Sequence, residues 1–164
     1  MQYRTADGQR FQIERQGAAW AQWAGEMVGA LPNGRKACLP LYDAAGSPMQ
    51  GRDSRGITAV LNSVTRCCTP TYVHGPVLNQ RITPGGLKSK AGRDKMAMLI
   101  ASYFDRPSYH IQFNVFDREM LLDAQKHPEN YRDLLVRVAG YSAFWVELSY
   151  EIQEDILRRT EQEL

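Results

Sequence analysis

Side chains that could do chemistry are few and scattered in this chain of 164 residues. The three histidines lie far apart, and none stands at metal-ligand spacing to a cysteine or carboxylate cluster, so we predict no metal site. The cysteines include no CxxC pair, which indicates no disulfide framework and a reducing compartment. Adjacent Cys67 and Cys68 could form a redox pair, although unremarkable thiols are the simpler interpretation. The P-loop, GxGxxG, HExxH and GxSxG signatures are missing.

One segment stands out from this background. Arg137-Val-Ala-Gly-Tyr-Ser142 follows the β-branched stretch Leu135-Val136, so Gly140 comes just after a predicted strand. Taken by itself, a glycine in that place is most often a backbone position that needs unusual φ and ψ angles.

The same segment resembles the RVxGY signature of glycyl radical enzymes. Five other stretches are similar to segments that this family carries, in the same order, and the similarity runs from about Ala18 to the last residue. RVAGYS resembles the branch that contains diol and hydroxyproline dehydratases, choline lyase and arylacetate decarboxylases. In size the chain resembles the autonomous glycyl radical cofactor of pyruvate formate-lyase. The five stretches are Pro32–Lys36, Ser47–Asp53, Thr58–Ser63, His110–Asn114 and Asp123–Pro128.

The resemblance implies that Gly140 is the catalytic residue and stores a backbone radical. A partner activating enzyme would install it, using S-adenosylmethionine and an iron–sulfur cluster; the chain itself would bind no cofactor. A glycine α-carbon that has lost a hydrogen atom can become planar and spread the unpaired electron over the flanking amides. Residues expected to position this loop or to be read by the activating enzyme are Arg137, Val138, Ala139, Tyr141 and Ser142. For Arg137 and Tyr141 a packing role is an equal alternative.

In this family the radical passes to a cysteine that lies far upstream of the region this chain resembles. Nothing here matches that loop, and the role is not assigned to Cys67 or Cys68. We therefore expect a radical-bearing part that serves a separate large catalytic part, in a lyase, dehydratase or decarboxylase reaction, and does not turn over substrate alone. Three accounts stay open: a natural small radical protein, a piece or small subunit of a larger enzyme, or a docking module that never holds a radical.

The fold implied by the resemblance is α/β, the C-terminal portion of a ten-stranded α/β barrel with helices, a few strands and the radical loop. Apolar periodicity predicts helices near residues 20–28, 57–67 and 96–104, with Trp20 and Trp23 as core anchors, and two more after the caps Asp117 and Ser149. Strands are predicted at 110–115 and 135–139. The polar face of the first strand should face water or a reactive group. It consists of His110, Gln112 and Asn114.

Composition and charge limit the classes of binding partner and the cellular compartment that we expect. Twenty Lys and Arg against 18 Asp and Glu give a net charge of +2, which nominates neither nucleic acid nor a membrane surface. No stretch is long and apolar enough for a membrane helix or a signal peptide, so a cytoplasmic protein is expected. Residues 1–16 are interpreted as a polar leader or tail and 17–164 as the glycyl radical domain. As a piece of a barrel, strands 111–115 and 135–139 should seek a partner sheet.

Overall fold

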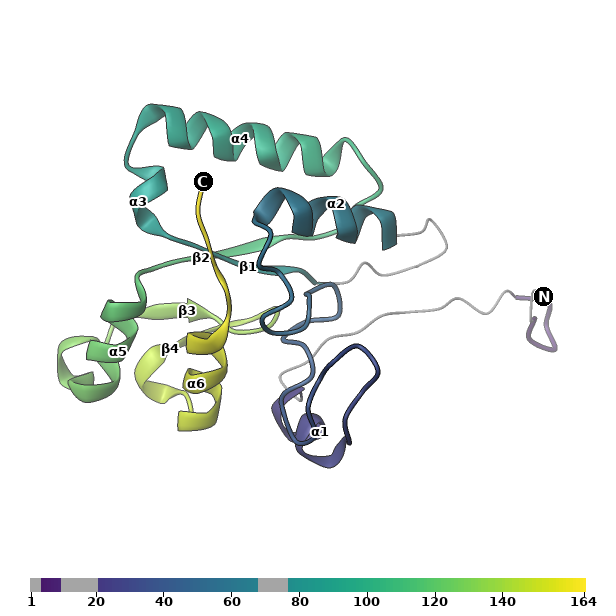
Figure 1. Ribbon diagram of the computed structural model, residues 1–164, viewed down its shortest axis with the longest axis horizontal. Coiled ribbons are helices and arrows are strands. Elements are labelled where there is room, and N and C mark those ends of the chain that lie inside the picture. Colours follow the sequence, from purple (N-terminus) through teal and green to yellow (C-terminus); the bar gives the residue numbers. More distant parts are fainter. Residues whose placement is uncertain (1–3, 10–20, 68–76) are drawn as a thin grey trace.

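The computed structural model describes residues 4–9, 21–67 and 77–164, and within them helices flank two small β units (Figure 1). In chain order the elements are α1 (Ala21–Met27), α2 (Ile57–Cys67), β1 (Asn79–Ile82), α3 (Pro84–Leu87), α4 (Lys90–Phe104), β2 (Gln112–Val115), α5 (Arg118–Lys126), the 3-10 helix η1 (Pro128–Asn130), β3 (Leu135–Arg137), β4 (Ser142–Phe144), the 3-10 helix η2 (Trp145–Glu147), α6 (Tyr150–Arg158) and β5 (Glu161–Gln162).

The first β unit is a parallel sheet in the order β2-β1-β5. Asn79 pairs with Gln112 at one end of β1, and Ile82 pairs with Val115 at the other. A parallel pair needs a crossover connection, which α3 and α4 supply between β1 and β2. The strand predicted at 110–115 is confirmed as β2, and β1 lies beside it from Asn79 to Ile82.

Helices α2 and α4 pack on one side of this sheet (Figure 1). Their apolar residues enclose Leu78 and Ile82, neither of which is exposed. Helix α4 begins after Ser89, whose hydroxyl accepts a hydrogen bond from the Gly92 N–H at 2.9 Å and so pairs one of the free amides of the first turn. The periodicity that predicted this helix identified its buried face in part: Met96, Leu99 and Tyr103 pack in the core, whereas Phe104 is 50% exposed.

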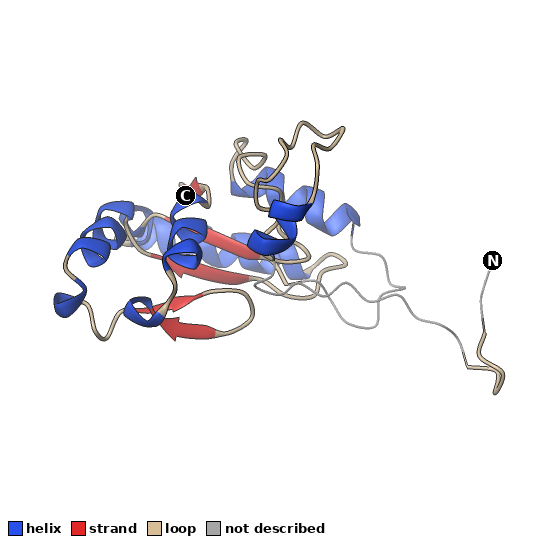
Figure 2. Cartoon of the chain, turned by 90° about the horizontal axis from the view of Figure 1, so that it is seen from below, coloured by secondary structure: helices blue, strands red, loops and turns tan. Residues whose placement is uncertain are grey.

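The second β unit is the antiparallel hairpin of β3 and β4, which lies with α5 and α6 on the other side of the sheet (Figures 1 and 2). Its core is built around Trp145, which is completely buried, together with apolar residues of the two helices. The predicted strand at 135–139 is confirmed as β3, although it ends at Arg137. The sequence did not predict β4. Because β4 pairs with β3, Gly140 lies in a hairpin turn rather than in an extended loop.

Helix α1 corrects one prediction. Trp23 is not a core anchor, because 62% of its surface is exposed. The side of α1 that turns inward carries Gly25, which packs so closely on the backbone at Leu39 that a Cβ would have no room. Trp20 lies outside the described residues, as does part of the boundary between the predicted leader and domain, which stays a prediction.

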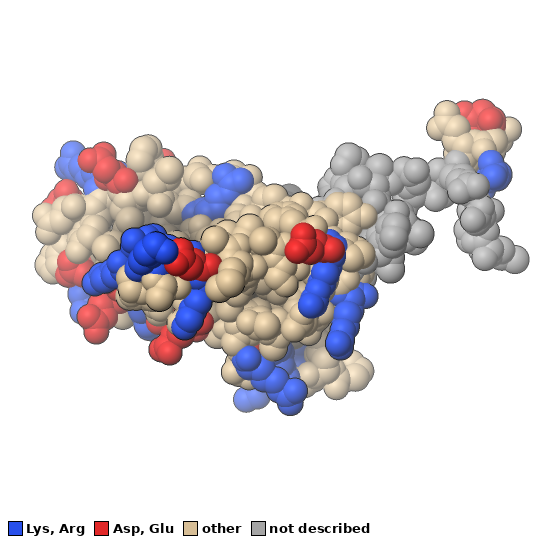
Figure 3. Space-filling view, turned by 90° about the horizontal axis from the view of Figure 1, so that it is seen from above, with Lys and Arg blue, Asp and Glu red and all other residues tan. Residues whose placement is uncertain are grey.

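The surface carries charges of both signs, interspersed over the face shown in Figure 3, as the small net charge leads one to expect. Among the described residues, no helix has the length and apolar character needed to cross a membrane.

Candidate functional site

Gly140 lies at the tip of the hairpin of residues 135–144, hereafter the Gly140 hairpin. Ala139 and Gly140 form its turn, which is closed by the Val138 N–H donating to the Tyr141 carbonyl at 2.9 Å. The φ angle of Gly140 is +80°, a left-handed value that costs a residue with a Cβ about 1 kcal/mol or more. Gly140 is exposed, and apart from its chain neighbours no heavy atom lies within 4 Å of the place a Cβ would occupy. Its α-carbon is therefore open to an approaching group.

The strand that leads to Gly140 is firmly packed. Val136 and Val138 are only 1% and 2% exposed and belong to the core around Trp145, whereas Leu135, just before Val136, points outward and is 56% exposed. This alternation is what a strand with one buried face requires. The exposure of Gly140 is thus a property of the turn itself and not of a loosely held segment.

Asn114 of β2 holds the hairpin by its backbone. Its side-chain Oδ1 accepts from the Arg137 N–H at 2.9 Å, and its Nδ2 donates to the Arg137 carbonyl at 2.7 Å. The amide side chain therefore pairs with the N–H and C=O of one residue, as a neighbouring strand would. Asn114 is only 5% exposed and Arg137 is half-buried, so these bonds are partly shielded from water. The polar face predicted for this strand faces the Gly140 hairpin.

Gln112, on the same face of β2, holds the hairpin by a side chain. Its Oε1 accepts from Arg137 Nε at 2.7 Å, and its Nε2 donates to Asn79 of β1. Arg137 also reaches Ser142 across the hairpin, with 3.2 Å between Nη1 and Oγ. Arg137 is thus tied to both strands of its hairpin and to the sheet, contacts that suit a residue that positions the loop.

The Val138 carbonyl, two residues before Gly140, receives two donors from other parts of the chain. Asn79 Nδ2 donates at 3.2 Å and Arg159 Nη1, just after α6, donates at 2.9 Å. The carboxylate of Asp43 lies behind both donors, 2.9 Å from Asn79 Nδ2 and 3.1 Å from Arg159 Nε. Burial raises the pKa of Asp43, and the Arg159 charge opposes that shift.

His110 lies two residues before β2, within reach of the charge of Arg137. Its Nδ1 is buried and has no hydrogen-bond partner, and burial lowers its pKa, with the charge of Arg137 acting in the same direction. His127 lies elsewhere, exposed and 3.6 Å from a carboxylate oxygen of Glu129, and His74 lies outside the described residues. Of the two histidines in the described part of the chain, His110 is the one near the Gly140 hairpin, and burial favours its neutral form.

Comparison with known proteins shows which family the chain belongs to. Residues 43–146, which include the whole Gly140 hairpin, match the family described as "Glycine radical". The chain belongs to the glycyl radical enzyme family. A probable dehydratase of Escherichia coli, YbiW, is 46% identical over 138 residues, and the trans-4-hydroxy-L-proline dehydratase of Clostridioides difficile is 41% identical over 160. These alignments cover 84% and 96% of the chain but only 17% and 20% of the two relatives.

Solved structures of glycyl radical enzymes show the same fold. The B12-independent glycerol dehydratase of Clostridium butyricum superposes with a TM-score of 0.86 at 42% identity, covering 99% of this chain and 20% of that enzyme. The hydroxyproline dehydratase of C. difficile gives a TM-score of 0.87 at 40% identity, with 98% and 20% covered. The chain is thus a mixed α/β domain that spans about a fifth of these enzymes and matches their C-terminal part.

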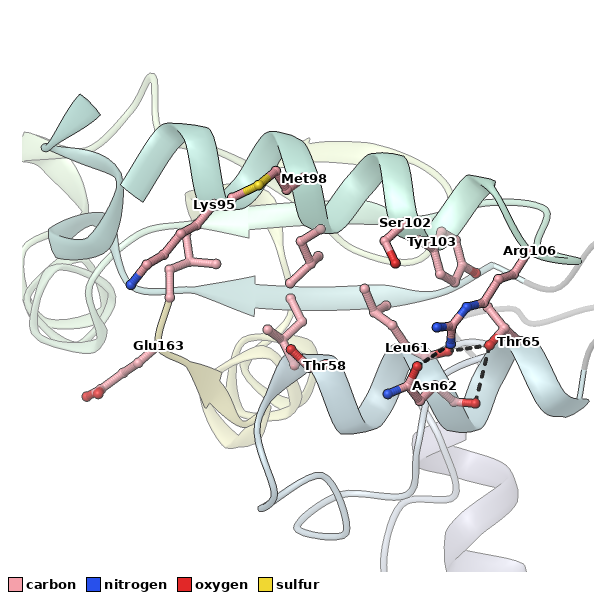
Figure 4. Close-up of a pocket in the computed structure, with 13 residues that line it drawn as sticks. Thr58, Leu61, Asn62, Thr65, Lys95, Met98, Ser102, Tyr103, Arg106 and Glu163 are labelled. Carbon is pink, nitrogen blue, oxygen red and sulfur yellow. Dashed lines mark hydrogen bonds between the residues drawn. The ribbon is translucent and has the colours of Figure 1, made fainter. Parts of the chain in front are cut away.

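One further concave surface lies away from the Gly140 hairpin. A groove of about 370 Å³ lies between α2 and α4, and Arg106 bridges its two walls by donating to Asn62 (Figure 4). Its floor is apolar, and Glu163 at one end points away from it. Cys67 is exposed at the end of α2, on the side of the sheet opposite the Gly140 hairpin, and Cys68 lies outside the described residues.

Sequence reasoning missed the residues that hold the Val138 carbonyl. Asp43, Asn79 and Arg159 come from a loop, a strand and a helix end, and no spacing in the sequence connects them. The one signal was indirect, because Asn79 begins a run of three polar residues, Asn-Gln-Arg, that is fully buried in β1. Buried polar groups need partners, so a polar run between apolar neighbours can indicate such a network.

Proposed function

We propose that this chain stores a backbone radical on Gly140 and passes it to a catalytic cysteine on a separate large part. The observation that carries the proposal is the open, left-handed Gly140 at the tip of a packed hairpin, within a chain of the glycyl radical enzyme family. An activating enzyme that uses S-adenosylmethionine and an iron–sulfur cluster removes one hydrogen atom from the α-carbon. The remaining electron spreads over the peptide groups on either side of Gly140.

The surroundings of Gly140 suit both steps. Because no neighbour covers the α-carbon, an activating enzyme can reach it in this conformation. Arg137 and Val138 position the turn through their bonds to β1, β2 and Arg159. Ala139, Tyr141 and Ser142 lie at or beside the tip, where a partner would read them.

The chain serves a larger partner because it spans about a fifth of the relatives it matches. Those relatives include dehydratases, a sulfite-lyase and decarboxylases. The proposed reaction is therefore of the lyase type, in the cytoplasm and under anaerobic conditions, with the large part supplying the cysteine and the substrate pocket. No turnover is expected from this chain alone.

The test is anaerobic incubation with S-adenosylmethionine and the activating enzyme of a dehydratase relative, followed by electron paramagnetic resonance. We expect a glycyl doublet, and after admission of air a backbone break at Gly140 that releases the segment ending at Leu164. Gly140→Ala should abolish both. Gly51→Ala is the matched control, because Gly51 is also exposed, has a φ of +74° and has no atom near its Cβ position.

Two results would contradict the proposal. A doublet that survives in Gly140→Ala would place the radical elsewhere. No doublet in the unsubstituted chain, with an activating enzyme active on its own partner, would favour a docking module that holds no radical.

A further inference from the structure

We propose that the groove between α2 and α4 binds an amphiphilic carboxylate, that is, an apolar chain that ends in one carboxyl group. The carboxylate lies at the Arg106 end of the groove, and the apolar chain lies along its floor. The groove is on the side of the sheet opposite the Gly140 hairpin. The inference therefore goes beyond the proposed function, and the binding requires no radical.

The floor of the groove is apolar and firmly packed. Ile57 and Leu61 of α2 are only 4% and 6% exposed, and Leu99 of α4 packs against the same core. The groove has a volume of about 370 Å³, which is typical of sites for small ligands. Such sites are mostly apolar, with a few polar groups that fix the orientation of the ligand. An alkyl chain on this floor is removed from water, which favours binding.

Hydrogen-bond donors gather at one end of the groove. Figure 4 shows Arg106 and Ser102 pointing from the α4 side toward Asn62 of α2. Arg106 Nη1 donates to Asn62 Oδ1. The other side-chain N–H groups of Arg106, the Asn62 amide nitrogen and the Ser102 hydroxyl have no partner in the part of the chain that the structure describes. A guanidinium can bind a carboxylate through two parallel hydrogen bonds, which are stronger than bonds between neutral groups.

The charges along the groove favour an anion and determine its direction. Lys95 lies at the end opposite Arg106, and both side chains are exposed. Among the described residues that line the groove, Glu163 is the one acidic side chain, and it lies at the Lys95 end and points away. Thr65 is already paired, because its hydroxyl donates to the Leu61 carbonyl at 3.0 Å. A ligand carboxylate is therefore expected at the Arg106 end, where it meets donors and no acidic side chain of the lining.

The test is isothermal titration calorimetry of the unactivated chain with hexanoate, octanoate and decanoate, each below its micelle concentration. Each added methylene that enters the groove should tighten binding about twofold to fourfold. 1-Octanol has the same chain length as octanoate without the charge, and it should bind about tenfold more weakly. Amide chemical shifts in NMR locate the site, because octanoate should shift amides of α2 and α4 and leave those of β3 and β4 unchanged.

Two pairs of variants test the groove residues. Arg106→Gln should weaken octanoate binding about tenfold, whereas Arg132→Gln, at an exposed arginine just before β3, should leave it unchanged. If Arg106→Gln does not fold, Met98→Asp gives a second test, because Met98 lines the groove and is 64% exposed. A carboxylate there repels the ligand and should weaken binding by a similar factor. Met120→Asp on α5 is its control, because Met120 is also exposed and lies outside the groove.

The outcomes separate this ligand from other occupants. Binding that depends on Arg106 and on chain length, with shifts confined to α2 and α4, supports the proposal. Equal binding of octanol and octanoate, or shifts at the Gly140 hairpin, would show unspecific apolar adsorption and overturn it. Absence of binding also overturns it, and a dimer in sedimentation whose α2 and α4 amides are protected from exchange would assign the groove to a second copy. Because no measurement here involves a radical, the proposed function is tested separately.

Discussion

Replacing Asn114 by leucine should loosen the Gly140 hairpin at a predictable cost. Leucine has a similar volume and fills the same buried space, but it cannot bond the Arg137 peptide group. Two hydrogen bonds of 2.7 and 2.9 Å are lost, and a carbonyl and an N–H are left without their partner. Each such group costs roughly 1 to 3 kcal/mol when water cannot replace the bond. Because Arg137 is half-buried, water replaces part of it, and a total of about 2 to 4 kcal/mol is expected.

The assay is urea and thermal unfolding of the purified chain. For a domain of this size the loss corresponds to a fall in Tm of roughly 5 to 12 °C. Asn130→Leu makes the same replacement at an exposed position and should change the free energy of unfolding by no more than about 0.5 kcal/mol. If Asn114→Leu is no worse than Asn130→Leu, the side-chain pairing between β2 and the hairpin contributes nothing, and our account of how the hairpin is held is wrong.

Two further predictions concern pH and backbone packing. Burial lowers the pKa of His110 from its usual 6.5, so the unfolded chain binds more protons, and stability should fall as pH drops through about 6.5. In unfolding at about pH 7.5 and 5.5, His110→Gln should therefore lose less stability than the unsubstituted chain, and equal losses in the two would contradict the assignment. Gly92→Ala should cost about 3 kcal/mol or more in urea unfolding, because its Cβ would lie 1.6 Å from the Gly86 carbonyl oxygen. Gly85→Ala, which meets no atom, should be neutral or slightly stabilising, and equal effects would show that α3 and α4 are not in close contact.

Periodic elements were predictable because one local pattern fixes each of them. The apolar spacing of α4 and the alternation of β2 and β3 are visible within a few residues, and the caps Ser149 and Asp117 begin the helices predicted after them. The same local reasoning failed for α1, where the inward face is chosen by the close approach of Gly25 to another segment, which leaves Trp23 exposed. Long-range contact decided that case, and no pattern within the helix reports it.

The residues of the site divide in the same way, into those that a local sequence pattern reveals and those that only long-range contacts bring together. Gly140 and Arg137 could be found because a motif of six residues carries them, and the polar face of β2 could be found because it alternates. Asp43 and Arg159 could not, since their pairing exists only after residues more than a hundred positions apart come together. Strand β1 is hard to predict for a related reason, because its buried run of polar residues has the composition of a loop.

The hairpin that carries Gly140 is fixed on one face and exposed on the other. Val136 and Val138 insert into the core, and the Val138 carbonyl accepts two hydrogen bonds, so the two-residue turn is held from behind. Outward from that core, Leu135 and Phe144 form a cross-strand pair that is 56% and 40% exposed. Exposed apolar residues grouped around a functional turn are typical of a surface that another protein covers. The same strand thus offers one face to the core and the other to a partner, which supports the proposal that Gly140 works against a surface this chain does not contain.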